Sequence, residues 1–571
     1  MKNKIIHQII DLNNLSLDNT IILNNISIDI IDDINKLSNI IFQQTNKNMG
    51  WLFSSILSRN PNQSNLFLYC SYLVLIDSLL LKNRNISKII VPSIGFKNVL
   101  SQYFLSNNIN IEIIVNTNKS IIRKIKDFIW IILGIFISIK NCWKLFSTKN
   151  IKRTRKIYNV EKIKLIDTRL LQNSINKGKY IDRYYNGLLD FLNDNERNKI
   201  FFVPHILGKF NSNDLDKIYF SSNENIIFKN DFLKISDYFF ALNSILKLGN
   251  ISTNFIKFRK FNILPIINEE LSINKYSVLI PLLNFRFFRR LKYSQIDLCL
   301  VVNWFENQPL DKGFNLGVKT YYPTVNHIGY KGYIGENDYN IYNNPTQFEV
   351  SNKLIPNVLG VTGIGCVNIS KKYYNRQNVK VFPSYRHQYL WKFNNYNYKM
   401  NKEVLVLFPL ATFEARNILN MMLKFQNDKN IKVTFYIKPH PALDFDKIKR
   451  DVSTPWPNNF IEISYDLSKI INNVNLVIGT GTSACMESIA LGIPTIIIGS
   501  RSNLTQCPIP NSVNTKIWKL IYSTDDLLKY ISYYLNLDKI KLQKFFFIGL
   551  KVKEEFFVEP SREKSKLFLN L

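Results

Sequence analysis

Short apolar runs alternate with polar, asparagine-rich stretches along the N-terminal half of the chain. Several runs have the length and continuous hydrophobicity of buried β-strands, at 86–92, 111–115, 162–167, 201–204 and 297–302. Residues 69–81 instead place apolar side chains at helical spacing. Strands and helices that alternate in this way predict an α/β fold.

The same alternation is most regular after residue 400. Strands are predicted at 404–408, 431–437, 474–478 and 495–498, with helices over 413–425 and after the third strand. Strands that are apolar throughout are typical of a parallel sheet covered by helices on both faces. We therefore expect an N-terminal domain over 1–395, a C-terminal domain over 396–540 after a polar linker at 394–399, and a helical tail over 541–571.

Composition narrows the class of protein. The length of 571 residues fits two to four domains at about 150 residues each. Hydrophobic residues make up 46% and charged residues 20%, which excludes a disordered chain. Six cysteines without C-x-x-C spacing and only five histidines predict no metal, no cofactor and no disulfide framework, and they suit a reducing cytoplasm. Asp11 follows Ile5 and Ile6 too soon for the apolar core of a signal peptide.

Positive charge is concentrated in one segment. The chain has a net charge of +31, and residues 119–156 hold eleven lysines and arginines against the single acid Asp127. Within this segment the apolar run 128–139 is shorter than the roughly 17–25 residues that span a bilayer. A short run between cationic flanks suits insertion into one leaflet of an anionic membrane. The alternative is a buried helix with solvated basic ends, and no motif for nucleic-acid binding accompanies the charge.

The sharpest local motif is the turn Gly479-Thr-Gly-Thr-Ser483, which follows a predicted strand and opens a helix. Gly479 and Gly481 allow a tight turn and a close approach of the backbone to a ligand. Thr482 and Ser483 are placed to cap the helix and to offer hydroxyl groups. Backbone N–H groups and the helix dipole then favour an anion, although this is not a Walker A loop. The alternative is an ordinary glycine-containing turn.

Lys438-Pro-His-Pro441 follows another predicted strand. Ligands of an open parallel sheet bind at the carboxyl ends of its strands, so we expect His440 and the 479–483 turn at one edge. Lys438 offers a fixed charge and His440 a ring donor for a phosphate. Glu487 is placed either to accept hydrogen bonds from ribose hydroxyls or only to interact with the helix dipole.

These segments, together with 487–494, resemble GT-B glycosyltransferases that carry a His-Pro motif and a Ser/Thr motif: bacterial sialyltransferases, Kdo transferases and capsule or teichoic-acid polymer transferases. Other segments are similar to a bacterial surface-carbohydrate (capsule and lipopolysaccharide) biosynthesis family, at Trp51, 58–61, 182–185, 304–311, 315–317 and 557–568. The resemblance implies two Rossmann-type domains facing a central cleft, with the nucleotide sugar in the C-terminal domain. It also implies that His440, Thr482 and Ser483 bind the nucleotide phosphate and that Glu487 contacts the ribose.

An inverting transferase needs a base that takes the proton of the acceptor hydroxyl. Glu306 follows a predicted strand, and Trp304 beside it is placed to stack on a sugar ring or to exclude water from the acid. The alternative for Glu306 is a structural acid paired with a lysine or arginine. Further candidates lie in the same half of the chain: Asp311 and Asp182 as alternative bases, Arg183, Tyr184 and Trp304 as acceptor-binding residues, and Arg386 or His387 as lining of the cleft.

These features predict a metal-independent glycosyltransferase that is peripheral on the inner face of the cytoplasmic membrane. Its donor is a nucleotide-activated sugar, a CMP-linked acidic sugar foremost, and its acceptor a lipid-linked surface glycan. The membrane surface is contacted through 119–156, and nucleic acid is not a partner. The alternatives are a CDP-polyol phosphotransferase of the teichoic-acid type, an inactive membrane-associated scaffold of glycan assembly, and a sugar-nucleotide epimerase.

Overall fold

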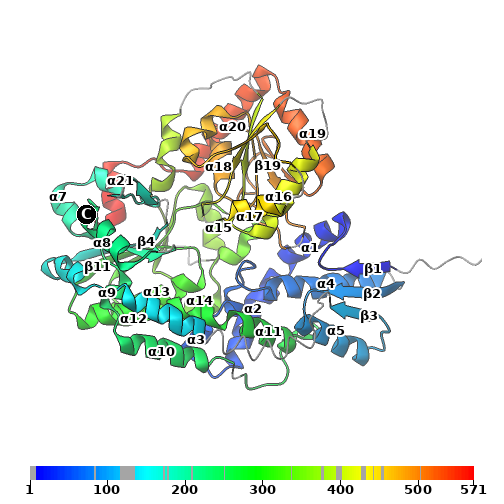
Figure 1. Ribbon diagram of the computed structural model, residues 1–571, viewed down its shortest axis with the longest axis horizontal. Helices are drawn as coiled ribbons and strands as arrows, with labels where there is room; N and C mark the ends of the chain where they lie inside the picture. The colour runs from blue at the N-terminus through cyan, green and yellow to red at the C-terminus, as the bar shows by residue number, and fades with distance from the viewer. Residues whose placement is uncertain are drawn as a thin grey trace, which may run out of the picture.

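The computed structural model describes residues 8–571 except 83–84, 116–135, 172–173, 177–178, 208–209, 250, 336, 374–377, 394–401, 426–432, 442, 452–454 and 502. Its architecture is α/β, as predicted, and rests on three sheets whose strands are all parallel (Figure 1). The predicted linker at 394–399 and most of the apolar run 128–139 lie outside the described residues.

The first sheet is small and has the strand order β1-β2-β3. Its strands are β1 (Gln8–Asp11), β2 (Ile86–Val91) and β3 (Glu112–Val115), and the main helices beside them are α1 (Leu17–Asp29), α2 (Ile31–Gln43), α4 (Leu66–Lys82) and α5 (Ile94–Ser106). Ser93 begins α5 as its N-cap, because its side chain accepts the backbone N–H of Phe96. The two strands and the helix predicted in this part of the chain are confirmed.

The second sheet has seven strands in the order β14-β13-β12-β11-β4-β7-β8. They are β4 (Ile163–Leu170), β7 (Ile200–Ile206), β8 (Asn225–Ile226), β11 (Leu298–Trp304), β12 (Asn326–Lys331), β13 (Val358–Val361) and β14 (Val379–Val381). Every residue of β4 is buried, which agrees with a strand covered on both faces. The range predicted as one N-terminal domain, 1–395, therefore contains two parallel sheets among its described residues, besides two short antiparallel pairs, β5-β6 (Ile175–Asn176, Lys179–Tyr180) and β9-β10 (Lys257–Phe258, Phe261–Asn262).

Helices of this second unit include α7 (Asp194–Asn198), α8 (Ser212–Ser221), α9 (Lys229–Phe232), α10 (Ile235–Leu246), α12 (Leu279–Tyr293), α13 (Pro309–Tyr321), α14 (Gln347–Ser351) and α15 (Gly365–Tyr373). Helix α11 (Leu264–Asn274) instead packs against α4 and α5 of the first unit. Helices α12 and α13 approach so closely that a Cβ atom on Gly313 would lie 2.1 Å from the carbonyl oxygen of Pro281. Only glycine fits there, and the contact holds α13 closely against α12.

The third sheet has the order β17-β16-β15-β18-β19-β20. Its strands are β15 (Glu403–Leu407), β16 (Thr434–Lys438), β17 (Phe460–Glu462), β18 (Leu476–Gly479), β19 (Thr495–Ile498) and β20 (Trp518–Ile521). Its helices include α16 (Thr412–Phe425), α17 (Phe445–Arg450), α18 (Ala484–Ala490) and α19 (Thr524–Leu535). The strands and helices predicted after residue 400 are confirmed, and they form a Rossmann-like domain.

The last two helices connect the C-terminal domain back to the second sheet. Helix α20 (Lys539–Phe556) packs against α18. Helix α21 (Arg562–Leu569) instead contacts the short helix η4 (Leu188–Phe191), and its Lys566 pairs at 2.7 Å with Glu196 of α7 (Figure 1). Phe568 on α21 is fully buried, and its ring packs against those of Tyr330, Phe382 and Tyr385. The chain therefore returns to the unit that it left before residue 400.

A buried ion cluster joins the first unit to the second. Glu349 on α14 lies between Arg59 at 3.0 Å and Lys312 of α13 at 2.8 Å, and all three side chains are at most 2% exposed. Arg59 directly follows the short helix η1 (Ile56–Ser58) in the left-handed region, with φ of 61°. Of the cluster, Arg59 lies in the segment 58–61, for which a resemblance to surface-carbohydrate proteins is noted above. The role of the cluster here is to hold two units together.

Candidate functional site

Each large sheet has a switch point, where the strand order reverses direction. In the second sheet β4 and β11 are neighbours, and the chain continues outward from them on opposite sides. In the third sheet β15 and β18 stand in the same relation. Ligands of doubly wound sheets bind outside the carboxyl ends of the strands at such a point. The predicted residues Trp304 and Glu306 lie at the first switch point, and the 479–483 turn lies at the second.

Glu306 is held in one orientation by its neighbours. The indole N–H of Trp304 donates to its Oε1 at 2.6 Å, and the side-chain amide of Gln308 donates to its Oε2 at 2.5 Å. The carboxylate is half-buried and has no lysine or arginine within salt-bridge distance among the described residues. This geometry suits a base with a fixed direction, and it speaks against the alternative of a structural ion pair.

Trp304 is fully buried, so its ring has no face open to a sugar. Of its two predicted roles, stacking on the acceptor and shielding the acid, the geometry favours the second. Tyr184 packs edge-on against it at 4.5 Å between ring centroids and is less completely buried. Arg183 forms an ion pair at 3.0 Å with Asp466, which follows β17, so this predicted acceptor residue joins the two domains.

Asp311 closes the first turn of α13 beneath Glu306. Its Oδ2 accepts the backbone N–H groups of Glu306 and Gln308, at 2.9 and 3.0 Å. Burial raises the pKa of Asp311 to about 7, and Arg169 at 3.7 Å from Oδ1 offsets only part of that effect. Its hydrogen bonds hold the loop that carries Glu306, which is the work of a positioning residue.

Asp182 is buried, and its surroundings do not suit the predicted role of a base. Its Oδ2 accepts the hydroxyls of Thr168 and Tyr180, at 2.5 and 2.7 Å, and its Oδ1 accepts the backbone N–H groups of Tyr184 and Tyr185, at 2.8 and 2.6 Å. Both oxygens are therefore used to shape the loop that presents Tyr184. The geometry favours this structural role over the predicted catalytic one.

The turn at 479–483 follows β18 and opens α18, as predicted. Its glycines face the protein rather than open space: a Cβ atom on Gly479 would lie 2.7 Å from Sγ of Cys485, and one on Gly481 would lie 2.7 Å from Cβ of Gln506. Ser483 is the N-cap residue, but its hydroxyl makes no capping hydrogen bond. The predicted side-chain cap is therefore wrong, and the hydroxyl is not used within the helix.

Lys438 ends β16, and His440 follows two residues later. The Lys438 ammonium donates to the carbonyl oxygen of Tyr465 at 2.6 Å. Burial lowers the pKa of His440, and the nearby Arg386 guanidinium lowers it further. The imidazole is therefore neutral near pH 7, with one N–H donor for a phosphate oxygen.

Glu487 has partners that the sequence did not indicate. It is 5% exposed, its Oε2 accepts the hydroxyl of Tyr389, and its Oε1 lies 3.5 Å from Nε2 of His387. Burial raises the pKa of this carboxyl, but His387 and Arg386 outweigh burial, so its pKa is lowered. A ribose would have to share this carboxylate with Tyr389.

The segment η8 (Tyr385–Lys392) links the two switch points. His387 and Tyr389 reach Glu487 of the C-terminal domain, while the guanidinium of Arg386 lies over the rings of Tyr184 and Trp304, at 5.6 and 6.0 Å. The expectation that Arg386 or His387 lies between the domains agrees with these contacts. Arg169 and Tyr389 were not predicted, because no local motif surrounds either residue.

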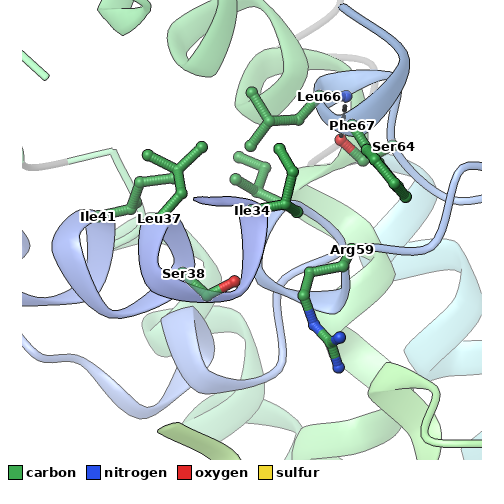
Figure 2. Close-up of a pocket in the computed structure, with 9 residues that line it drawn as sticks. Ile34, Leu37, Ser38, Ile41, Arg59, Ser64, Leu66 and Phe67 are labelled. Atoms are coloured by element: carbon green, nitrogen blue, oxygen red, sulfur yellow. Dashed lines mark hydrogen bonds between the residues drawn. The ribbon is translucent and has the colours of Figure 1, made fainter. Parts of the chain in front are cut away.

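A small cavity lies away from this site, between α2, η1 and the start of α4 (Figure 2). It is lined mostly by aliphatic side chains and leaves room for about one water molecule. Figure 2 shows the guanidinium of Arg59 directed away from Leu66 and Phe67. It pairs with Glu349 at 3.0 Å. The cavity is a packing defect beside the ion cluster. Within the described residues, no group of three or more His, Cys, Asp or Glu side chains is arranged to hold a metal ion.

No protein-family model and no curated protein matches the chain. Solved structures with a similar arrangement include a putative UDP-N-acetylglucosamine 2-epimerase from Listeria monocytogenes, at 10% identity over 72% of this chain and 95% of that chain with a TM-score of 0.42. MnaA of S. aureus in complex with UDP shares 9% identity over 72% of this chain and 98% of that chain, with a TM-score of 0.43. CalG4, the calicheamicin glycosyltransferase, shares 9% identity over 72% of this chain and 98% of that chain, with a TM-score of 0.38. At these scores no residue role is carried over to this chain.

Proposed function

We propose that this protein is a GT-B-type glycosyltransferase that moves a sugar from a nucleotide-activated donor, a CMP-linked sugar foremost, to a surface glycan. The observation that carries the proposal is the pair of switch points joined by η8. One presents a fixed carboxylate, Glu306, and the other presents His440 and the 479–483 turn. A base on one domain and an anion-binding edge on the other are what transfer from a nucleotide sugar requires.

In this proposal the C-terminal domain holds the donor. His440, Lys438 and the turn formed by Gly479, Gly481, Thr482 and Ser483 contact the phosphate, and Glu487 contacts the ribose in exchange for Tyr389. As the glycosidic bond to phosphate breaks, negative charge grows on the leaving nucleotide, and fixed donors and cations stabilise it. Glu306 takes the proton of the acceptor hydroxyl.

The acceptor is proposed to be lipid-linked, because one face of the N-terminal domain combines exposed apolar and cationic side chains. The helix over 136–147 exposes Phe136, Ile139 and Trp143, at 65%, 48% and 72%, with Lys140 and Lys144 between them. Helix α10 exposes Ile235, Phe239 and Leu246, at 59%, 65% and 56%, and contacts that helix through a ring pair of Tyr238 and Phe146 at 6.2 Å. We call these residues the basic apolar face.

Residues 136–159 carry seven lysines and arginines and no acid, and all but Arg153, which is buried against Asp231, are at least partly exposed. Such a face suits an anionic lipid surface, which attracts the cations and accepts the aromatic rings. No helix within the described part of the chain is long and apolar enough to cross a bilayer. The proposed attachment is therefore peripheral, on the inner face of the cytoplasmic membrane.

Calorimetry with CMP, CDP, UDP and GDP tests the proposal. We expect the wild type to bind one nucleotide class and His440→Ala to bind it at least tenfold more weakly, because a hydrogen bond to a charged phosphate is lost. His205→Ala is the matched control, since His205 lies near the end of β7 in the other domain. Thermal unfolding of each variant verifies that it is folded.

Absence of nucleotide binding by the folded wild type would contradict the proposal and favour an inactive scaffold. If a nucleotide binds, product analysis with the matching donor separates the remaining alternatives. A glycan extended by a sugar supports transfer, and a phosphate-bearing product supports the polyol phosphotransferase. Free epimerised sugar nucleotide in the absence of an acceptor supports an epimerase.

A further inference from the structure

Arg386 is an exposed cation between the two domains. It belongs to η8, where its neighbours Tyr385 and His387 are buried and it alone of the three faces outward. Its guanidinium lies 5.6 Å from the ring centroid of Tyr184 and 6.0 Å from that of Trp304, so two rings of the N-terminal domain hold its plane. Its charge also lowers the pKa of His440 and contributes to the lowered pKa of Glu487, both in the C-terminal domain.

The guanidinium has no carboxylate partner within the described part of the chain. Other arginines of this region are neutralised: Arg183 pairs with Asp466 at 3.0 Å, and Arg169 lies 3.7 Å from Asp311. The two acids of the proposed site, Glu306 and Glu487, are each contacted by other polar side chains, as described above. Five guanidinium N–H donors therefore remain available at the point where both domains meet.

We infer that Arg386 is a binding residue for a phosphate group, and that the anion it takes is the phosphate or diphosphate of the nucleotide that leaves during transfer. This inference rests on the proposed function and names a ligand contact within it. A planar guanidinium binds two phosphate oxygens at once, and it keeps its charge at every relevant pH. Stacked on Tyr184 and Trp304, it would bring the leaving phosphate to the side of the site where Trp304 holds Glu306.

The test compares Arg386→Gln and Arg386→Lys with the wild type by calorimetry. The probes are CMP, CDP and UDP, the nucleosides cytidine and uridine, and inorganic pyrophosphate. We expect Arg386→Gln to weaken nucleotide and pyrophosphate binding about 10- to 100-fold and to leave nucleoside binding unchanged, because only the phosphate contact is lost. Arg386→Lys recovers part of the affinity, since an ammonium is a single point charge. Arg562→Gln, which changes another exposed arginine at the start of α21, is the matched control and binds like the wild type.

Two outcomes separate this inference from the proposed function. Equal nucleotide affinity of wild type and Arg386→Gln overturns the inference and leaves the transferase proposal in place. If the folded wild type binds no nucleotide, the proposed function fails, and pyrophosphate decides the inference alone. Pyrophosphate binding that Arg386→Gln abolishes supports the phosphate site, whereas equal binding or none by the wild type overturns it.

Discussion

Glu349 illustrates how strongly one residue can depend on its surroundings. Burial alone raises the pKa of this carboxyl, but Arg59 and Lys312 outweigh burial and hold its pKa at about 2. Removing one partner of a buried ion cluster leaves the others without compensation. Glu349→Gln keeps the size of the side chain, removes its charge and replaces one acceptor oxygen by an NH2 donor.

We expect Glu349→Gln to lower the free energy of unfolding by about 3–5 kcal/mol, because two buried cations lose their counter-charge. Chemical denaturation measures the loss. Glu462→Gln is the control: Glu462 is 41% exposed beside Lys449, and such surface pairs contribute about 0–1 kcal/mol. Equal effects of the two substitutions would contradict the assignment of a joint between two units.

The same cluster has a pH dependence with a definite sign. The pKa of Glu349 lies below the ordinary glutamate value of 4.5 in the folded protein, so the unfolded chain binds the proton more readily. Its stabilising contribution is complete above pH 4.5 and is lost as the pH falls towards about 2. Glu349→Gln should flatten this part of the stability curve.

At the residue scale the sequence indicates which residues lie at strand ends but not what they contact. Glu306, His440 and the 479–483 turn were predicted there because the apolar strands before them have clear ends. The contact of Glu487 with Tyr389 joins residues 98 positions apart. A carboxylate early in a helix looks the same in the sequence whether it meets a ribose, a solvent molecule or a buried tyrosine.

At the scale of elements, the basic apolar face consists of two helices whose outward sides differ from those of ordinary surface helices. Trp143, Phe136 and Phe239, at 72%, 65% and 65% exposure, are its aromatic side chains. Each ring that enters a lipid interface removes apolar area from water, at about 25 cal/mol per Å². The face lies on the side of the molecule away from the C-terminal domain, where Figure 1 shows α10.

We predict that the protein sediments with vesicles containing phosphatidylglycerol and that Trp143→Asp combined with Phe239→Asp lowers this binding at least tenfold. Added salt should weaken the wild-type binding, because it screens the attraction between lysines and anionic headgroups. Phe547→Asp, on α20 with 54% exposure, is the control in the opposite domain. Vesicle binding that persists in the double variant would contradict the assignment of this face.

The existence and type of the elements followed from hydrophobic spacing, since a strand or helix is recorded in adjacent residues. The order of the strands within each sheet did not follow from hydrophobic spacing. β4 pairs with β11, which comes after six α-helices and some 130 residues of chain. The residues of either strand do not indicate which strand is its partner. The switch points that locate the site could therefore be described only from the folded chain.

At the scale of the whole molecule, α21 ties the end of the described chain to the second sheet. Phe568 is fully buried, whereas Leu567 beside it is 69% exposed. We expect Phe568→Ala to destabilise the N-terminal domain by about 3–5 kcal/mol, the usual cost of emptying a buried phenylalanine site. Leu567→Ala should change stability by no more than about 0.5 kcal/mol.

Denaturant unfolding with intrinsic fluorescence measures both variants. Nucleotide binding should survive Phe568→Ala under native conditions, because the proposed donor site lies in the other domain. Loss of nucleotide binding together with an unchanged unfolding transition would contradict both the packing role of Phe568 and the location of the proposed donor site in the other domain.

The return of α21 also has a consequence for the order in which the protein matures during synthesis. Tyr185, Trp304 and Tyr330 leave the ribosome long before Phe568, yet all four side chains belong to one aromatic cluster. Domains usually fold as they emerge, the N-terminal one first. Here the packing of the nascent N-terminal domain stays incomplete until the residues of α21 have been translated. The aromatic cluster around Trp304 is thus completed last, so that an unfinished chain would carry Glu306, the proposed base, beside an incompletely packed Trp304.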